Sequence, residues 1–587
     1  MKKDFIQDNS EDIIQEKEEE DPILSTAPLH LKLQHKNEVI NIILDTLANN
    51  KQALVFVNSK RAAEKTAEDI AKAIASGSNE LVVLSERLLT VLSKPTEQCK
   101  RLANSVKKGI AYHHAGLLTE QKNLVEDSFK SGAIRVICCT PSLAYGVDTP
   151  AFRVIVRDLK RYTHHGMDFI PVLEYQQMAG RAGRPGKEIF GEAICIAQTE
   201  NEKEKIFDKY VYGEAEEIYS KLAVEPVLRT YLLSLIATNI VNSRKSILQF
   251  FSKTFWAYQF KDMKKLEKII EKMLTLLQEY KFIQKEGETF QDAGDLIGAN
   301  RGDEINQKKG LFSDFADALS LSQELDQFDL FSNGDKAFGE QVFIATLIGR
   351  RVSELYLDPL TAHHIISALQ LTEKKLINDY SYLSMICSTL EMRPLLRVKV
   401  KEYDVIQEQV LKIQDFLLIL EPPYYDPDYE DFVNAMKTTF FLHDWVNESD
   451  EVSLLEKYDV RPGEIRVKVE LADWLLYSSE ELAKLLQMQK LVKDLAKLRY
   501  RVQYGAKDEL LALLQLQGIG RIRARKLFSN GIKDLGDIKK IDLQSLVQLI
   551  GKSIAVDIKQ QVGEKVRPED VQVKQNKRKG DISLKDF

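Results

Sequence analysis

Arg181 and Arg184 stand three residues apart among glycines, in the run QMAGRAGRPG at residues 177–186. A guanidinium is planar, stays charged and can bind two oxygens at once, so a pair of arginines suits phosphate oxygens. Arginines in such a position can stabilise the charge that develops when a γ-phosphate is transferred. We expect the glycine-flanked pair to open a helix. A run of this kind on its own would more often be an ordinary surface turn, but further motifs accompany it.

A second basic motif lies near the C-terminal end, in the run LQGIGRIRARKL at residues 516–527. Its two glycines let backbone N–H groups approach a phosphate at a helix N-terminus, where the helix dipole also favours an anion. The pattern predicts a helix-hairpin-helix turn that contacts nucleic acid, although a solvated basic helix would have a similar composition. The residues predicted to contact phosphates are Gly518, Gly520, Arg521, Arg523 and Arg525.

Three further runs precede the arginine pair: VFVNSKR at residues 55–61, YHHAGL at 112–117 and CTPSLAYGVDTP at 139–150. Together with residues 177–186, and in this order, they resemble motifs IV to VI of superfamily 2 helicases. The resemblance is strongest to archaeal DNA helicases of the superkiller type, relatives of helicase Q and of the helicase half of polymerase theta. Such a helicase uses ATP and Mg²⁺, and its motor consists of two RecA-like lobes.

The resemblance implies that residues of these runs take part in ATP hydrolysis. It makes Gln177, Arg181 and Arg184 catalytic. The family usually has asparagine at the position of Asp148, so the role of that residue is less certain. The implied nucleotide-binding residues are Gly146, Asp148 and Gly180.

Other residues are predicted to contact DNA. Asn58, Ser59 and Thr140 follow predicted strands, where hydroxyl and amide groups can hold phosphates. Residues 157–169 read as two short β arms around a His-His-Gly turn, and the resemblance implies that this hairpin is the wedge that parts the duplex. Stacking of an aromatic ring on the terminal base pair would contribute about 1–3 kcal/mol per base. The hairpin residues implied to contact DNA are Arg161, Tyr162 and Phe169.

The helix predicted over Glu464–Gln487 carries Arg466, Lys468 and Trp474 within three turns. The resemblance implies that this helix lines the path of a single strand. Trp474 would stack on a base, and Arg466 or Lys468 would bind a phosphate, because the family's expected arginine is Val467 here. Without the resemblance, Trp474 would be interpreted as a core residue.

The elements that must position these residues change in kind along the chain. The short β-prone runs are Ala53–Val57, Ile134–Cys139, Val154–Val156 and Ala193–Ala197. They alternate with helical stretches between about residues 29 and 197, which predicts a parallel α/β sheet. Long amphipathic helices follow, with a hairpin-like stretch near 281–289 and an acidic insertion that contains one predicted helix, Leu311–Phe331. With the resemblance, the predicted fold class is an α/β RecA-like lobe followed by mainly α-helical domains.

The predicted domains are an acidic disordered leader (1–27), a second RecA-like lobe (28–200), a winged helix (201–290), an acidic insertion (291–340), a helical ratchet domain (341–503), a helix-hairpin-helix domain (504–563) and a charged tail (564–587).

Composition limits the class of protein. The formal net charge is −6, but residues 1–21 hold nine acids and three lysines, so the remainder is neutral on average and any nucleic-acid site must be a local basic patch. No apolar run approaches the roughly 20 residues that span a bilayer, and the acidic N-terminus is unlike a signal peptide. We expect a soluble cytoplasmic protein, associated with the nucleoid.

The five cysteines form no CxxC pair, and His113 and His114 have no third ligand nearby, so no metal site is predicted.

A GxxxxGK[ST] P-loop and an acidic Mg²⁺ motif are absent from the sequence. The run at Gly551–Ser553 resembles a P-loop end, but Leu546 stands where the first glycine belongs. The resemblance implies a 3′-to-5′ DNA helicase acting on forked or branched DNA. Its ATP and Mg²⁺ would be bound mainly by a first lobe that is either a separate polypeptide, which Met1 and the charged leader favour, or missing from a truncated or mis-started product. Two alternatives stay open: a non-catalytic protein that binds branched DNA, and half of an RNA-remodelling helicase.

Overall fold

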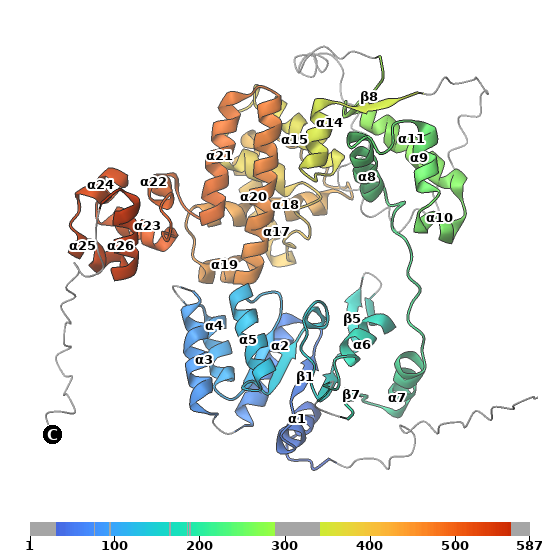
Figure 1. Ribbon diagram of the computed structural model, residues 1–587, viewed down its shortest axis with the longest axis vertical. Helices are drawn as coiled ribbons and strands as arrows, with labels where there is room; N and C mark the ends of the chain where they lie inside the picture. The colour runs from blue at the N-terminus through green and yellow to red at the C-terminus, as the bar shows by residue number, and fades with distance from the viewer. Residues whose placement is uncertain are drawn as a thin grey trace, which may run out of the picture. The chain divides into compact units, whose positions relative to one another are not determined.

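The computed structural model describes residues 31–74, 77–92, 95–163, 166–184, 186, 189–287 and 341–564 (Figure 1). The predicted leader, the acidic insertion with its Leu311–Phe331 helix, and the tail beyond Glu564 lie outside the described residues. The chain forms two compact units, one built mainly from residues before 214 and the other mainly from residues after 215.

A five-stranded parallel sheet forms the centre of the first unit, with strand order β2-β3-β1-β4-β7. In register, Ala53 of the central strand lies opposite Val136 on one side and Arg153 on the other. The inner strands are buried along their whole length, which explains their continuous apolar runs. The strands are β1 (Ala53–Phe56), β2 (Ile110–His113), β3 (Val136–Cys139), β4 (Arg153–Val156) and β7 (Glu192–Cys195).

This sheet confirms the predicted α/β lobe, but β2 was not among the predicted strands. Its sequence Ile110–His113 ends in the first histidine of the YHHAGL run, and a helix begins soon after that run, at Thr119. The helices of this part of the chain are α1 (Glu38–Ala48), α2 (Lys60–Lys72), α3 (Asn79–Thr90), α4 (Glu97–Val106), α5 (Thr119–Ser131), η1 (Pro141–Ala144), α6 (Val172–Ala179), α7 (Glu200–Ile206) and η2 (Phe207–Val211).

Two antiparallel strands, β5 (Lys160–Thr163) and β6 (Gly166–Phe169), form the hairpin that the sequence predicted. Lys160 pairs with Phe169 at its base, and Thr163 pairs with Gly166 next to the turn. Figure 1 shows this hairpin beside α6.

The second unit begins with four helices and a two-stranded ladder, β8 (Ile283–Lys285) with β9 (Phe343–Ala345). The hairpin-like prediction for 281–289 was therefore only half right, because the partner of β8 comes from beyond the insertion and not from the adjacent residues. The four helices are α8 (Glu225–Ala237), α9 (Arg244–Phe251), α10 (Phe255–Phe260) and α11 (Met263–Glu279).

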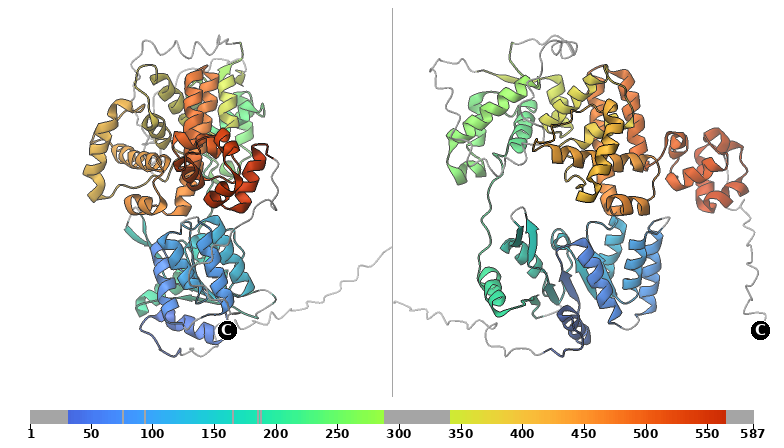
Figure 2. Two further views of the ribbon diagram at one scale, coloured as in Figure 1. Left: turned by 90° about the vertical axis from the view of Figure 1, so that its left-hand side faces the viewer. Right: turned by 180° about the vertical axis from the view of Figure 1, so that it is seen from behind.

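A helical bundle follows and shares one continuous apolar core with these elements, from Leu228 to Val502. Its longest helix, α20 (Pro462–Leu485), begins where Pro462 occupies the first turn and Arg461 and Glu464 form a reciprocal cap. Helices α20 and α21 lie side by side (Figure 2). The remaining helices are α14 (Leu347–Glu354), α15 (Pro359–Leu371), α16 (Asp379–Cys387), η4 (Val400–Glu402), α17 (Tyr403–Ile413), η5 (Gln414–Phe416), α18 (Tyr429–Val446), α19 (Glu451–Tyr458) and α21 (Gln489–Tyr504).

A small helical group with its own apolar core, from Ala506 to Val562, ends the described chain. Gly551 lies at φ +89° between two of its helices, so the run at Gly551–Ser553 opens a helix and is not part of a P-loop. The helices are η6 (Asp508–Leu510), α22 (Leu511–Leu514), α23 (Arg521–Ser529), α24 (Leu535–Lys540), α25 (Leu543–Ile550) and α26 (Lys552–Gln561). Among the described residues, no helix is both long enough and apolar enough to cross a membrane.

Candidate nucleotide and nucleic-acid sites

The carboxyl edge of the parallel sheet collects the polar residues that follow β1 and β3, because parallel strands end at one edge. Asn58 and Ser59 are exposed there, and Thr140 is half-buried. The Asn58 N–H donates to Asp158 Oδ2 at 3.0 Å, and Ser59 Oγ accepts the Ala62 N–H at 3.2 Å as the N-cap of α2. The three residues predicted to contact phosphates therefore lie at one edge of the sheet. A backbone bond fixes the position of Asn58, and a helix-cap bond fixes that of Ser59.

The arginine pair lies after a helix and not at the start of one, which corrects the sequence-based expectation. Helix α6 ends at Ala179, and Gly180 and then Gly183 at φ +91° turn the chain away. Arg181 donates to the Ala144 carbonyl at 2.5 Å, and Arg184 donates to the Pro150 carbonyl at 3.3 Å. A cation suits this location because a helix C-terminus carries partial negative charge.

The loop after β3 and the arginine run are joined by backbone bonds. Ala151 donates to the Arg181 carbonyl at 2.9 Å, and Gly183 donates back to the Ala151 carbonyl at 2.7 Å. The implied nucleotide-binding residues border this junction. Gly146 lies in the loop at φ +74°, and Asp148 is exposed a few residues before Ala151. Gln177 and Gly180 are exposed at the end of α6.

In the hairpin, Phe169 lies at the base and not at the tip. Lys160 Nζ lies 4.7 Å from the centre of the Phe169 ring, and the Tyr210 ring packs edge-on at 6.3 Å. Phe169 therefore does not fit the predicted stacking on a terminal base pair, because its ring is engaged within the lobe. Arg161 forms an ion pair with Glu174 at 2.7 Å.

Sequence reasoning missed Met167, which pairs with Tyr162 near the turn and is 54% exposed. The alternation of the strand was the available signal, because it places residues 167 and 169 on the same face. The side chain of Tyr162 lies outside the description, so its predicted contact with DNA stays a prediction.

On α20, Lys468 does not fit the predicted phosphate contact. The side chain is only 7% exposed in total, and its ammonium donates to the carbonyls of Met392 and, at 2.6 Å, of Pro394. Burial lowers the pKa of this ammonium. Arg466 is exposed and forms an ion pair with Glu470, so it is the cation of the two that DNA could reach. Trp474 is half-buried and its Nε1 donates to the Leu355 carbonyl at 3.2 Å.

The basic motif of α23 divides into inward and outward arginines. The Arg521 guanidinium lies 4.4 Å from the Trp445 ring centre, and burial lowers its pKa. Arg525 forms ion pairs with Glu448 and, at 2.6 Å, with Glu509. These two arginines hold the terminal helices to the loop after α18, so the predicted phosphate role does not fit them.

Arg523 is the exposed arginine of the motif, and its guanidinium donates to the Gly518 carbonyl at 3.1 Å. Gly518 lies at φ +84°, and a Cβ at Gly518 or Gly520 would meet no other atom within 4 Å. The turn before α23 therefore presents open backbone beside the exposed Arg523, and its predicted contact with phosphate stays a prediction.

We expect Arg523→Ala to lower the slope of log K against log salt for DNA binding by about one, because one phosphate contact releases about one counterion. Arg525→Ala serves as the matched control and should lower the melting temperature while leaving the slope unchanged. Equilibrium titrations of a labelled DNA fork between 50 and 200 mM salt provide the measurement. If Arg523→Ala leaves the slope of log K against log salt unchanged, Arg523 is exposed to solvent and contacts no DNA phosphate.

His113 and His114 each lie against a glutamate carboxylate. His113 Nε2 lies 2.8 Å from a Glu126 carboxylate oxygen, and His114 Nε2 lies 3.2 Å from one of Glu64. Arg101 pairs with Glu64 as well, at 3.0 Å. Across the described ranges, no group of three potential metal ligands occurs. Burial also raises the pKa of the adjacent thiols of β3, Cys138 and Cys139, which keeps them protonated.

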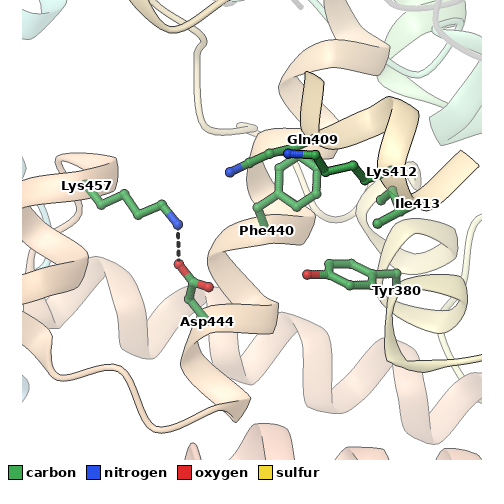
Figure 3. A pocket seen from close by; sticks show the side chains of 7 residues that line it. All are labelled: Tyr380, Gln409, Lys412, Ile413, Phe440, Asp444 and Lys457. Carbon is green, nitrogen blue, oxygen red and sulfur yellow. Dashed lines mark hydrogen bonds and ion pairs between the residues drawn. The ribbon is translucent and has the colours of Figure 1, made fainter. Parts of the chain in front are cut away.

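A pocket of about 120 Å³ opens among α16, α17, α18 and α19 (Figure 3). Lys457 pairs with Asp444 at 2.7 Å across its mouth, and Lys412 pairs with Glu408. The cations are therefore balanced by acids, and the lining includes none of the sequence-predicted site residues. The lining residues are Tyr380, Gln409, Lys412, Ile413, Phe440, Asp444 and Lys457.

Comparison with known proteins matches three family models to successive parts of the chain. These are the helicase conserved C-terminal domain at residues 34–186, a helix-turn-helix domain at 191–284 and archaeal helicase domain 4 at 380–505. The chain is 37% identical over 542 residues to the ATP-dependent DNA helicase Hel308 of Methanococcus vannielii, covering 90% of this chain and 68% of that protein. It is 35% identical over 559 residues to the Hel308 helicase of Pyrococcus horikoshii, covering 94% of this chain and 69% of that protein.

Proposed function

This chain belongs to the Hel308 family of archaeal ATP-dependent DNA helicases, and we propose that it supplies the second motor lobe and the strand-guiding helical domains of a 3′-to-5′ DNA helicase. Its proposed substrates are forked or branched DNA, and its proposed role lies in replication-coupled repair and recombination. The observation that carries the proposal is the junction of the arginine run with the loop after β3, through Ala151, Arg181 and Gly183.

The junction suits nucleotide chemistry because its backbone bonds fix the position of the arginine run. Arg181 donates one N–H to the Ala144 carbonyl, and a guanidinium carries five N–H donors in total. ATP would supply the transferable phosphate. Arg181 and Arg184 would bind the charge that grows on it, and Gln177, with Asp148, Gly146 and Gly180, would border the nucleotide. Mg²⁺ binding needs acidic ligands for which this chain provides no recognised motif.

The same lobe can connect nucleotide state to DNA. Thr140 begins the loop whose far end, at Ala151, is bonded to the arginine run. A shift of the arginines would therefore move the loop that carries the proposed phosphate contact. Asn58 and Ser59 follow the adjacent strand β1 and would hold the same DNA backbone.

The P-loop and the acidic Mg²⁺ motif of the motor must come from sequence outside these 587 residues. We propose that they reside on a first RecA-like lobe that can act as a separate polypeptide. We propose that the third of the Methanococcus vannielii relative that this chain does not match carries such a lobe, and the experiment uses that part.

The test uses the purified 587-residue chain, a labelled DNA fork and an RNA fork of the same sequence. The chain alone should prefer the DNA fork and should hydrolyse ATP at background rate. Addition of the first lobe from the Methanococcus vannielii relative should produce DNA-stimulated hydrolysis. Robust hydrolysis by the chain alone would contradict the division of the motor. Preference for RNA would favour the RNA-remodelling alternative, and fork binding without any gain in hydrolysis would favour the non-catalytic one.

A further inference from the structure

We propose that Tyr356, at the C-terminal end of α14, stacks on a base of the single strand that runs along α20. The inference rests on the proposed function, because it assigns a DNA contact to the same helical domain. Its starting point is a contrast in exposure. Tyr356 is 81% exposed, whereas the leucines on either side of it, Leu355 and Leu357, are buried.

The backbone holds this exposed ring in a fixed place. The Tyr356 N–H donates to the Ser353 carbonyl at 3.1 Å, and the Leu357 N–H donates to the Val352 carbonyl at 3.3 Å. These two bonds form the Schellman motif that ends many helices. Immediately afterwards, Asp358 pairs with the fully buried Arg229 at 2.7 Å, so the chain is anchored on both sides of the tyrosine.

Tyrosine is an unfavourable residue for this position. The motif requires a left-handed conformation, and Tyr356 has φ +57°. Glycine adopts this conformation without strain, whereas a bulky side chain does not. The left-handed conformation of Tyr356 therefore costs free energy, although the exposed ring adds no core packing. Such local backbone strain often occurs at functional positions.

Two contacts place the tyrosine beside α20. Arg351 of α14 pairs with Glu481 of α20, and Trp474 Nε1 donates to the carbonyl of Leu355, the residue just before the tyrosine. These contacts follow one another in opposite order along the two helices, so the end of α14 lies level with Trp474. Exposed α20 residues continue from there towards Arg466 and Val467.

A highly exposed phenol, one residue after the carbonyl to which the half-buried Trp474 indole is bonded, suits single-stranded DNA. Every base has a π-face, so aromatic rings bind successive bases without sequence preference, and each stack contributes strongly to affinity. Duplex DNA offers such faces only at its ends. The ring of Tyr356 would thus add a second contact beyond the one proposed for Trp474.

The test compares Tyr356→Gly with Gln487→Gly in the full chain. Gln487 ends α20 in the same motif, with φ +59° and bonds from Gln487 to Lys484 and from Met488 to Ala483. Both variants relieve the same backbone strain, so both should raise the melting temperature. Only Tyr356→Gly should weaken binding of labelled oligo-dT, by about tenfold. Tyr356→Phe keeps a ring and should bind as the wild type does.

Equal oligo-dT affinity for Tyr356→Gly and the wild type would overturn the inference while leaving the proposed function intact. A lower melting temperature together with weaker binding would also overturn it, since it would make the tyrosine a structural residue. A wild-type chain that does not bind oligo-dT would overturn the proposed function itself, and the inference with it. Loss of binding confined to Tyr356→Gly, with a raised melting temperature, supports the proposal.

Discussion

Arg184→Ala should reduce DNA-stimulated ATP hydrolysis by the reconstituted motor by about 10³-fold or more, and should leave fork affinity within about twofold of the wild type. Arginine fingers contribute roughly 10³–10⁵ in rate because they stabilise charge that exists only in the transition state. The side chain is half-buried and bonded to the Pro150 carbonyl, on the loop that ends at the junction with the arginine run. The measurement is steady-state hydrolysis with and without single-stranded DNA, after mixing with the first lobe.

Two further variants make the result specific. Arg184→Lys keeps the charge but loses the planar fork, so most of the rate should still be lost. Arg135→Ala removes a half-buried arginine that precedes β3 and bonds to Asn50, at the opposite edge of the sheet, and should leave hydrolysis unchanged. Hydrolysis by Arg184→Ala at near wild-type rate would show that the arginine run lies outside the catalytic site.

The sheet of the first unit was predictable because its inner strands are short apolar runs buried on both faces. Ala53–Phe56 and Val136–Cys139 show this pattern clearly. Strand β2 was missed because its four residues include a tyrosine and a histidine, although all four are buried. Their polar atoms find partners only in the folded state, as the bond between His113 and Glu126 shows. Such distant partners leave no local signal in the sequence.

The site residues divide in a similar way. The sequence pattern places Asn58, Ser59 and Thr140 after predicted strands, and in the structure all three lie at one edge of the sheet. The sequence pattern does not predict the direction in which a cationic side chain points, because that direction depends on which carboxylates or carbonyls lie near it in the folded chain. Lys468 turns inward to two carbonyls, and Arg525 turns to Glu448 from a loop 77 residues earlier. Spacing on a helix predicts neither partner.

Replacement of residues 161–168 by Asn-Gly should abolish unwinding of forked DNA by the reconstituted motor while preserving most of its DNA-stimulated hydrolysis. Hydrolysis drives movement along one strand, whereas separation needs a rigid element that occupies the place of the next base pair. Opening each step of a duplex costs about 1.4 kcal/mol of stacking free energy. A hairpin closed by antiparallel pairing from Lys160 to Thr163 is stiff enough to maintain that separation.

The design keeps the base of the hairpin, because Lys160 and Phe169 pack there with Tyr210 and their loss would disturb the lobe. An Asn-Gly pair closes a two-residue hairpin turn without strain.

Met167→Ala is the milder companion variant. It removes the exposed side chain near the turn and should slow unwinding severalfold without changing hydrolysis. Strand displacement from a labelled fork and phosphate release are measured in the same reaction. Unwinding that survives the replacement would exclude the hairpin as the wedge, and hydrolysis that disappears with it would show that the hairpin instead supports the motor lobe.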